Sequence, residues 1–283
     1  MKRGRAVSGI FLSVLGLLLL SVSLLGDFTA LGHYESRGPR PWEQFNLELV
    51  TRTPDYDSLV AEAEKRAGGR LQKLPPGEAM ELLYVMVIER FTHKSANHNL
   101  FSNWILWALG KFHPYFAHIR DERKLVSGGH SLLCGQSSFL LLSLANDIGI
   151  RSRHVGLGRH VVMEAFYDND WHLYDPDMEV YVRDSNGDVL SVQELSNPNN
   201  DDLLRAAYAG PKEDIIPTLI SREDNTFMSY PPGSWFVWKS QVMYLMEKAT
   251  NYLKYMIPLF LFTLGIIIIL ISNRLQSDRA QED

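Results

Sequence analysis

The sequence contains one cysteine among 283 residues, so no intramolecular disulfide bond can form. The same shortage excludes zinc and iron–sulfur sites that need several cysteines. The net charge is -5, and the chain lacks the basic surface that binds DNA or RNA. Phosphate-binding, dinucleotide-binding and G-x-S-x-G serine-hydrolase motifs are also missing. These absences predict a protein that uses no nucleotide, organic cofactor or metal and that binds no nucleic acid.

Charge is missing from two long apolar segments. The first, residues 7–26, follows Lys2, Arg3 and Arg5 and at about 1.5 Å per residue is long enough to cross a bilayer. The second comprises residues 256–272. A cleaved signal peptide is the alternative for the first segment, but no good A-x-A cleavage motif follows it. The sequence therefore predicts two membrane-spanning helices.

Basic residues before the first segment place the N-terminus in the cytoplasm by the positive-inside rule. Two spans return the C-terminus to the same side, so the domain between them is expected on the extracytoplasmic side. The absence of N-x-[ST] sequons favours a bacterial inner membrane. The expected organisation is a cytoplasmic tail (1–6), a transmembrane helix (7–26), a juxtamembrane helical region (27–77), a core domain (78–185), a C-terminal extension (186–255), a transmembrane helix (256–272) and a second cytoplasmic tail (273–283).

Hydrophobic periodicity predicts helices in the first half of the region between the spans and strands after them. Helices are expected at 55–67, 78–91, 103–112, 135–148 and 235–254. Strands are expected at 150–157, 160–167 and 171–174, around a turn at 168–170. Helices followed by antiparallel strands make the expected fold class α+β.

Cys134 lies between a polar loop and the start of the apolar helix predicted over residues 135–148. Free N–H groups and the positive end of the helix dipole favour a thiolate at such a position. The same N–H groups can stabilise an oxyanion on an acylated sulfur. A small buried apolar side chain is the alternative interpretation of a lone cysteine.

His160 opens one predicted strand, and Asp175 ends the strand that returns beside it. A cysteine nucleophile needs an imidazole to take its proton and a carboxylate to orient that imidazole. Two hairpin registers are open, one pairing Asp175 with Glu164 and the other with Val162. Either register places Asp175 on the same sheet face as His160, because side chains alternate along a strand. A diagonal approach would then bring the two side chains together.

Three motifs resemble the transglutaminase-like superfamily. They are Cys134–Ser137, Gly149–Arg153, and His160 together with Trp171–Pro176. The resemblance implies a papain-like core, with a helical front half and an antiparallel sheet behind it. It also implies a Cys-His-Asp catalytic triad formed by Cys134, His160 and Asp175.

The resemblance is specific over Ser127–Val182 and weaker back to Glu78, and it covers neither end of the chain. Ser152 replaces a proline that is usual in the family, and Val161-Val162 replaces a common Ala-Trp pair. Both departures fall in strands and remove no catalytic group.

Members of this superfamily also complete the oxyanion hole with a side-chain donor. Asn103, Trp104 and Trp107, upstream of the cysteine, are candidates for this role, as is Gln136. Packing in an aromatic core is the alternative role for the tryptophans, and capping of the helix start is the alternative for Gln136.

Five further histidines precede Cys134: His93, His98, His113, His118 and His130. Spacings of five residues do not align ligands on one helix face, so these histidines are expected to be dispersed and solvated and to hold no metal. His172 lies near the strand end that carries Asp175, but its side chain is on the opposite face of the sheet. His160 is therefore the expected base.

The expected function is acyl transfer or hydrolysis at protein or peptide amide bonds, through a thioester on Cys134. Hydrolysis and transamidation both follow from such a thioester, and the sequence does not distinguish them. The alternative is a non-catalytic scaffold or binding module in a membrane complex of envelope or surface-polymer assembly.

Overall fold

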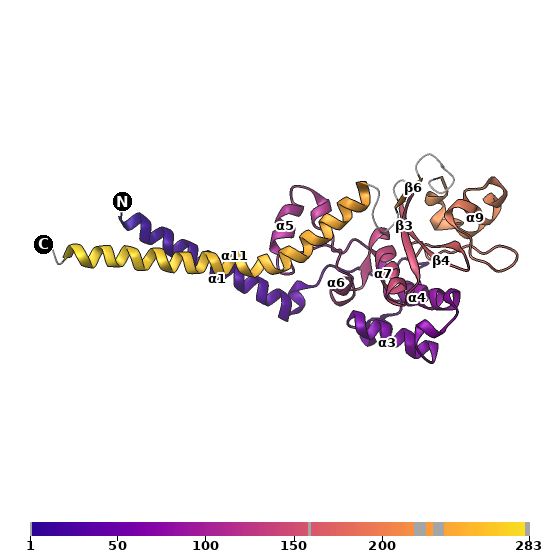
Figure 1. The fold of residues 1–283 in the computed structure, drawn as a ribbon, viewed down its shortest axis with the longest axis horizontal. Helices are drawn as coiled ribbons and strands as arrows, with labels where there is room; N and C mark the ends of the chain where they lie inside the picture. Colours follow the sequence, from indigo (N-terminus) through magenta and orange to yellow (C-terminus); the bar gives the residue numbers. More distant parts are fainter. Residues whose placement is uncertain (1, 158–159, 218–224, 229–234, 281–283) are drawn as a thin grey trace. The chain divides into compact units, whose positions relative to one another are not determined.

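A computed structural model describes residues 2–157, 160–217, 225–228 and 235–280 (Figure 1). The chain divides into two compact units, each described here by itself. Unit 1 consists of three separate segments, Met1–Tyr34, Asn97–His118 and Leu245–Asp283. Unit 2 consists of Glu35–Ala96 and Ile119–Tyr244. Residues 97–118 fall inside the core domain expected from the sequence, yet they belong to unit 1.

Unit 2 begins with helices and continues with a sheet, which confirms the α+β class. Its front half comprises α2 (Leu47–Arg52), α3 (Tyr56–Ala67), η2 (Leu71–Lys73), α4 (Pro76–Arg90), β1 (Thr92–His93), α6 (Glu122–Ser127), β2 (Ser131–Leu132) and α7 (Cys134–Asp147). The back half comprises β3 (Arg151–Leu157), β4 (His160–Tyr167), β5 (Asp170–Tyr174), α8 (Val192–Leu195), η4 (Pro198–Asn200), α9 (Asp201–Ala207), η5 (Gly210–Ile215) and β6 (Asn225–Met228).

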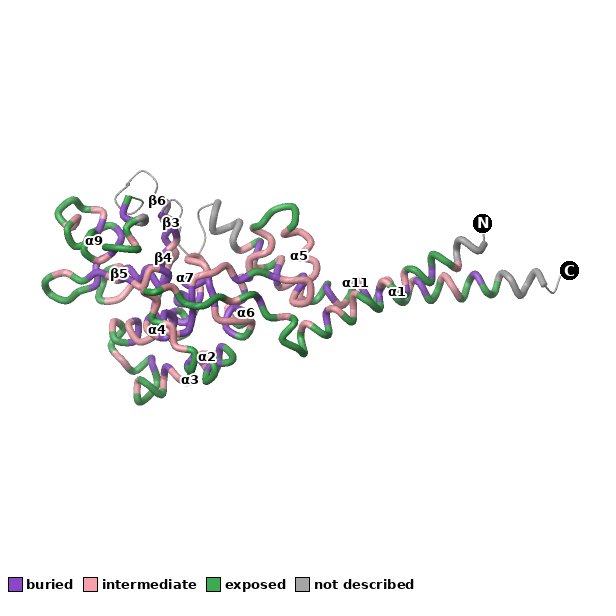
Figure 2. Tube along the Cα trace, turned by 180° about the vertical axis from the view of Figure 1, so that it is seen from behind, coloured by how far each residue is buried: buried purple, intermediate pink, exposed green. Residues whose placement is uncertain are grey.

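The sheet of unit 2 has the strand order β5-β4-β3-β6, with every neighbouring pair antiparallel. Helix α7 packs against β3 and β4, and α4 packs against α7. Buried residues gather where α4, α7 and β4 meet (Figure 2). A second cluster, formed by β3–β5 with α8 and α9, includes Val155, Val162, Leu173, Leu195 and Leu204. Apolar side chains therefore cover the sheet. They come from helices that precede the strands in the sequence and from helices that follow them.

Helix α7 is apolar on most of its surface because it is packed between the sheet and α4. Leu140, Leu141 and Leu144 are fully buried along it. The helix gives way to Gly149, whose φ of 89° lies in the left-handed region that glycine tolerates best. The Ile150 N–H then donates to the Ala145 carbonyl at 2.9 Å, and the chain enters β3. Strand β3 thus turns back along α7, and β4 begins where β3 ends. The start of α7 and the start of β4 therefore lie in one site.

The β4–β5 hairpin has a two-residue turn at Asp168-Asn169, both with positive φ, as in a type I′ turn. Tyr167 pairs with Asp170, and the register continues to Met163 opposite Tyr174. Extending this register by one residue places position 175 opposite Val162, which is one of the two registers expected from the sequence. The turn itself is shorter than the loop assumed for that register.

In unit 1, α1 (Lys2–Phe28) and α11 (Trp235–Ala280) lie side by side and antiparallel (Figure 1). Both are long and apolar enough to cross a membrane, over Ala6–Phe28 and Gln241–Arg274. This agrees with the two spans expected from the sequence. Small residues at heptad spacing on α1, at positions 9, 16 and 23, allow the two helices to approach closely.

The contact between α1 and α11 is made largely by backbone and short side chains. A Cβ on Gly16 would lie 2.6 Å from the Pro258 carbonyl oxygen, so the residue has to be glycine. The Ser23 hydroxyl donates to the Lys254 carbonyl at 3.0 Å. This packing resembles that of membrane helices, where small residues and interhelical hydrogen bonds replace a hydrophobic core.

Segment 97–118 completes unit 1 with α5 (Trp104–Gly110) and η3 (Pro114–Phe116); the short η1 (Ala30–Gly32) follows α1. Polar pairs hold the segment against α11. His98 Nε2 lies 3.1 Å from Glu247 Oε1, and both side chains are buried. The Lys254 ammonium bonds to Asp27 of α1 at 2.5 Å and to the Ser102 carbonyl at 3.0 Å. One lysine thus links all three chain segments of unit 1.

Candidate active site

Cys134 is the first residue of α7, immediately after the short strand β2. Strand β2 pairs in parallel with β1, with Thr92 opposite Ser131 and His93 opposite Leu132. This two-stranded ladder fixes the loop that leads to the cysteine. As a whole residue Cys134 is half-buried, and its sulfur belongs to a buried group with His160 and Asp177. The helix start also brings backbone N–H groups of α7 next to the sulfur.

His160, the first residue of β4, lies between two partners. Its Nε2 lies 2.8 Å from Asp175 Oδ2, within hydrogen-bonding distance. Its Nδ1 lies on the side of Cys134 and Asp177, and the ligand atoms of these three residues all lie within 4.8 Å of one another. The Asp175 carboxylate accepts the Nε2–H, which leaves the Nδ1 lone pair facing the thiol. The diagonal approach of Asp175 to His160 that was expected from the sequence is the geometry found.

Asp175 is fully buried and held from several directions. The Tyr208 hydroxyl donates to its Oδ2 at 3.0 Å, and the Met178 N–H donates to its Oδ1 at 3.1 Å. Its backbone pairs with Val180 just beyond the end of β5. These bonds stabilise the carboxylate and fix the direction in which it orients His160.

The environment of His160 sets its protonation. Burial lowers the pKa of His160, but the Asp175 carboxylate and the Cys134 side chain outweigh burial and raise that pKa well above its usual 6.5. A protonated imidazole next to a sulfur is the state that results when the thiol proton has moved to the base. The site therefore favours an imidazolium, as a cysteine nucleophile requires.

A second carboxylate, Asp177, lies two residues after Asp175. Its Oδ2 is 3.8 Å from His160 Nδ1, and its Oδ1 bonds to the Nδ1 atom of His93. The His93 backbone N–H in turn donates to Glu43 Oε1 at 3.0 Å. His160 is thus flanked by two buried aspartates, one at each ring nitrogen.

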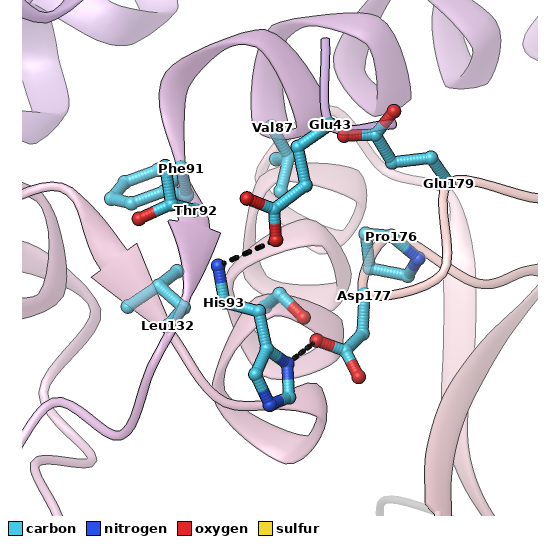
Figure 3. A pocket seen from close by; sticks show the side chains of 10 residues that line it. Glu43, Val87, Phe91, Thr92, His93, Leu132, Pro176, Asp177 and Glu179 are labelled. Carbon is cyan, nitrogen blue, oxygen red and sulfur yellow. Dashed lines mark hydrogen bonds and ion pairs between the residues drawn. The ribbon is translucent and has the colours of Figure 1, made fainter. Parts of the chain in front are cut away.

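A small pocket of about 10 Å³, room for about one water molecule, lies beside His93 and Asp177 (Figure 3). Glu43, His93, Asp177 and Glu179 supply its polar lining. Burial is the main reason why the pKa of Glu179 rises to about 7, and neighbouring Glu43 raises it further against the lowering effect of Lys212 and of bonds from Gln44. The lining therefore becomes more negative as the pH rises through neutrality.

Three of the four expected oxyanion residues, Asn103, Trp104 and Trp107, belong to unit 1, whereas Cys134 belongs to unit 2. Asn103 Oδ1 accepts the Leu106 N–H as the cap of α5, and its Nδ2 donates to the Thr250 hydroxyl at 2.9 Å. Trp104 Nε1 donates to the Lys254 carbonyl at 3.2 Å. Both polar groups are thus bonded within their own unit, and their oxyanion role stays a prediction.

Gln136 lies in the first turn of α7, with its amide directed at neighbouring loops. Its Oε1 accepts the Ala96 and Leu133 N–H groups, and its Nε2 donates to the carbonyls of Ala96 and Ile119. With four hydrogen bonds to backbone groups, the Gln136 side chain fixes the loop before Cys134. The expectation of helix-start capping matches this geometry, and a contribution to the oxyanion hole stays a prediction.

Three residues of the site were not expected from the sequence: Asp177, His93 and Tyr208. The D-P-D run at 175–177 was a usable signal for Asp177, because a carboxylate two residues after Asp175 stays near the same strand end. His93 and Tyr208 reach the site through tertiary structure alone. His172 lies apart, as expected, with Nδ1 2.6 Å from the Val189 carbonyl.

No protein-family model matches this chain, and neither curated proteins nor solved structures show a significant similarity to it. Its chemistry is therefore inferred from the geometry of Cys134, His160 and the two aspartates.

Proposed function

We propose that this protein is a membrane-anchored cysteine acyl transferase or hydrolase with a transglutaminase-like, papain-like catalytic core. The observation that carries the proposal is the position of His160, with one ring nitrogen at Asp175 and the other beside Cys134. A nucleophile, a base and a group that orients the base are the three parts that covalent acyl transfer needs.

In the proposed reaction the Cys134 thiol transfers its proton to His160 Nδ1, and the sulfur attacks a substrate amide carbonyl. Backbone N–H groups at the start of α7 stabilise the resulting oxyanion. His160 then gives its proton to the departing amine, and the C–N bond breaks to leave a thioester on Cys134. Water or an acceptor amine attacks the thioester with His160 as base, and the thiol is restored.

Asp175 is proposed to hold the imidazole with Nδ1 toward the sulfur and to stabilise the imidazolium. Its burial and its bonds from Tyr208 and Met178 keep the carboxylate in one position. Removing such a carboxylate changes the tautomer and orientation of the imidazole while leaving the nucleophile in place.

The two apolar helices support a membrane anchor, and the basic residues before α1 support a cytoplasmic N-terminus. Unit 2 is therefore proposed to act on the extracytoplasmic side of a bacterial inner membrane. The proposed substrate is a protein or peptide that presents an amide bond to Cys134.

Alkylation of the full-length, metal-free protein by iodoacetamide tests the proposal, because Cys134 is the sole cysteine and every adduct reports on it. We expect His160→Ala to slow alkylation at pH 6 about tenfold or more, since the thiol then keeps its proton. Asp175→Asn should slow it less. Intact-mass spectrometry over time gives both rates.

His113→Ala is the matched control, since His113 is exposed and belongs to unit 1. Its alkylation rate should equal that of the wild type. Equal rates in the wild type and in folded His160→Ala protein would show that the imidazole does not activate the thiol, and the proposed mechanism would be wrong.

A further inference from the structure

Asp177 has no part in the proposed acyl transfer, although it is a buried carboxylate at the centre of the site. It is 6% exposed and lies on the thiol side of His160, opposite Asp175. A nucleophile, a base and an orienting carboxylate are complete without it. Its position therefore calls for another function.

The electrostatics of the site make this carboxylate unusual. The Cys134 sulfur, His160 Nδ1 and a carboxylate oxygen of Asp177 all lie within 4.8 Å of one another. A thiolate and a carboxylate so close together repel each other in a poorly solvated site. A cation between them removes the repulsion, and the imidazolium is one such cation. A metal ion is another, and it can contact all three groups at once.

The donor set is that of a borderline-soft divalent metal. One sulfur, one imidazole nitrogen and one carboxylate oxygen are all zinc ligands, whereas the sulfur argues against magnesium and calcium. Three protein ligands are also the number that zinc takes from the protein in its catalytic sites, where water supplies the fourth ligand.

Groups around these three ligands hold them in place. His160 donates its other N–H to Asp175, which is the carboxylate–histidine arrangement that orients and strengthens a metal-binding imidazole. Asp177 is fixed by its bond to His93, and both face the same pocket (Figure 3). The ligand atoms are therefore pre-arranged on two residues, and the Cys134 sulfur completes the set.

We propose that Cys134, His160 and Asp177 form a binding site for Zn²⁺ that regulates the enzyme. On binding, the Cys134 thiol loses its proton to solvent, the sulfur and His160 Nδ1 coordinate the ion, and Asp177 supplies the third ligand. The bound ion occupies the lone pairs that acyl transfer uses, so metal binding and thioester formation exclude each other. The regulatory part rests on the proposed function, whereas the binding itself does not.

Co²⁺ is the spectroscopic probe for this site, and the protein is the full chain in detergent after removal of metals. Wild-type protein is expected to bind one Co²⁺, to develop a sulfur-to-cobalt charge-transfer band and to lose that band when Zn²⁺ is added. Cys134→Ser should abolish the band. Asp177→Asn should weaken binding about 10- to 100-fold or more, whereas the exposed Asp170→Asn on the same hairpin should bind like the wild type.

Zn²⁺ protection of the thiol gives an independent measurement. Equimolar Zn²⁺ should slow alkylation of Cys134 in the wild type and in Asp170→Asn, and much less in Asp177→Asn. Without metal, Asp177→Asn should be alkylated as fast as the wild type or faster, because a negative neighbour of the thiolate is gone. If Asp177→Asn does not fold, wild-type titration and protection still decide the question.

The outcomes separate the two proposals. Failure of wild-type protein to give a charge-transfer band, or to be protected by Zn²⁺, overturns the metal site and leaves the His160-dependent reactivity of metal-free Cys134 untouched. Metal binding by a protein whose metal-free thiol does not depend on His160 overturns the proposed acyl transfer and leaves Zn²⁺ binding as the function of the site.

Discussion

The two units of the chain place apolar and polar side chains in opposite positions. In unit 2 the apolar residues are inside, as Leu141 of α7 shows with an exposed fraction of 0%. In unit 1 the long helices expose apolar residues, with Phe11 at 64% and Leu17 at 53%. Along these two helices unit 1 buries polar side chains, including Ser23 and Lys254.

This reversal is the one expected if α1 and α11 lie in lipid, as proposed above, and unit 2 lies in water. Water drives apolar side chains into the interior, whereas lipid gives them no reason to leave the surface. In lipid, close packing of small residues and internal polar bonds hold helices together. The Gly16 contact and the Lys254–Asp27 pair are bonds of that kind. Unit 1 thus has the side-chain distribution of a membrane domain and unit 2 that of a water-soluble one.

The largest expected effect on this comparison is a loss of unfolding free energy, and a pair of leucine truncations tests it. Leu141→Ala leaves a cavity in the core of unit 2 and should lower the free energy of unfolding of that unit by about 2–5 kcal/mol. Leu17→Ala, on the exposed face of α1, should leave the same quantity unchanged. Urea unfolding of detergent-solubilised protein measures both free energies, with the reactivity of Cys134 toward a thiol reagent as the signal for unfolding. Similar losses in the two variants would contradict the comparison.

A smaller effect is expected from Gly16→Val in unit 1. The added side chain meets the Pro258 carbonyl oxygen and the Phe262 nitrogen, which are backbone atoms, so the helices must separate at a cost of about 1–3 kcal/mol. Spin labels at exposed Val7 and Ile267, in a Cys134→Ser background, report the separation of α1 and α11 by pulsed electron resonance. The distances should lengthen or broaden in lipid.

The control for this measurement is Leu18→Val, because Leu18 faces outward on the same helix. Its label distances should equal those of the parent protein. An unchanged distance in Gly16→Val would show that α1 and α11 are not held together by the small-residue contact.

The smallest effect concerns the pH dependence of unit 2. Burial raises the pKa of Glu179 to about 7 from an ordinary 4.5, so the native state binds the proton more tightly than the unfolded state does. The stability that this group contributes is present below about pH 4.5 and is lost as the pH rises through 7. Glutamine mimics the protonated acid, so Glu179→Gln should stabilise unit 2 at pH 8 and not at pH 4.5.

Because Glu179 is only half-buried, solvent screening reduces the expected gain at pH 8 to about 1 kcal/mol. Urea unfolding at the two pH values measures it, with Glu48→Gln on the exposed surface of α2 as the control. A gain of equal size at pH 4.5 would contradict the assigned cause.

Local pattern was enough to predict the longer elements of unit 2, which are α3, α4, α7, β3, β4 and β5. The strand expected at 160–167 is β4, and the helix expected at 135–148 is α7 within one residue at each end. Alternation, a turn of Asp and Asn, and a glycine after an apolar run are all signals carried by neighbouring residues. Strand β6 could not be predicted in this way, because it pairs with β3 from about 70 residues away.

The site follows the same rule. Cys134, His160 and Asp175 could be proposed from the sequence because each lies at the end of a strong local element. Asp177 and Tyr208 were missed because their importance depends on contacts, and Tyr208 reaches Asp175 across 33 positions of sequence. Unit 1 shows the limit most clearly, since nothing in the pattern of residues 97–118 assigns that segment to the membrane helices.

The discontinuous make-up of unit 1 has a consequence for the order of folding. His98 pairs with Glu247 across 149 positions, and Lys254 meets Asp27 across 227. Contacts of such long range close late, because the chain between them must first be made and ordered. During synthesis, α1 and segment 97–118 therefore wait for α11, while nearly all of unit 2 has already left the ribosome. Assembly of unit 1 is therefore expected to be the final step of folding, because it needs all three of its segments.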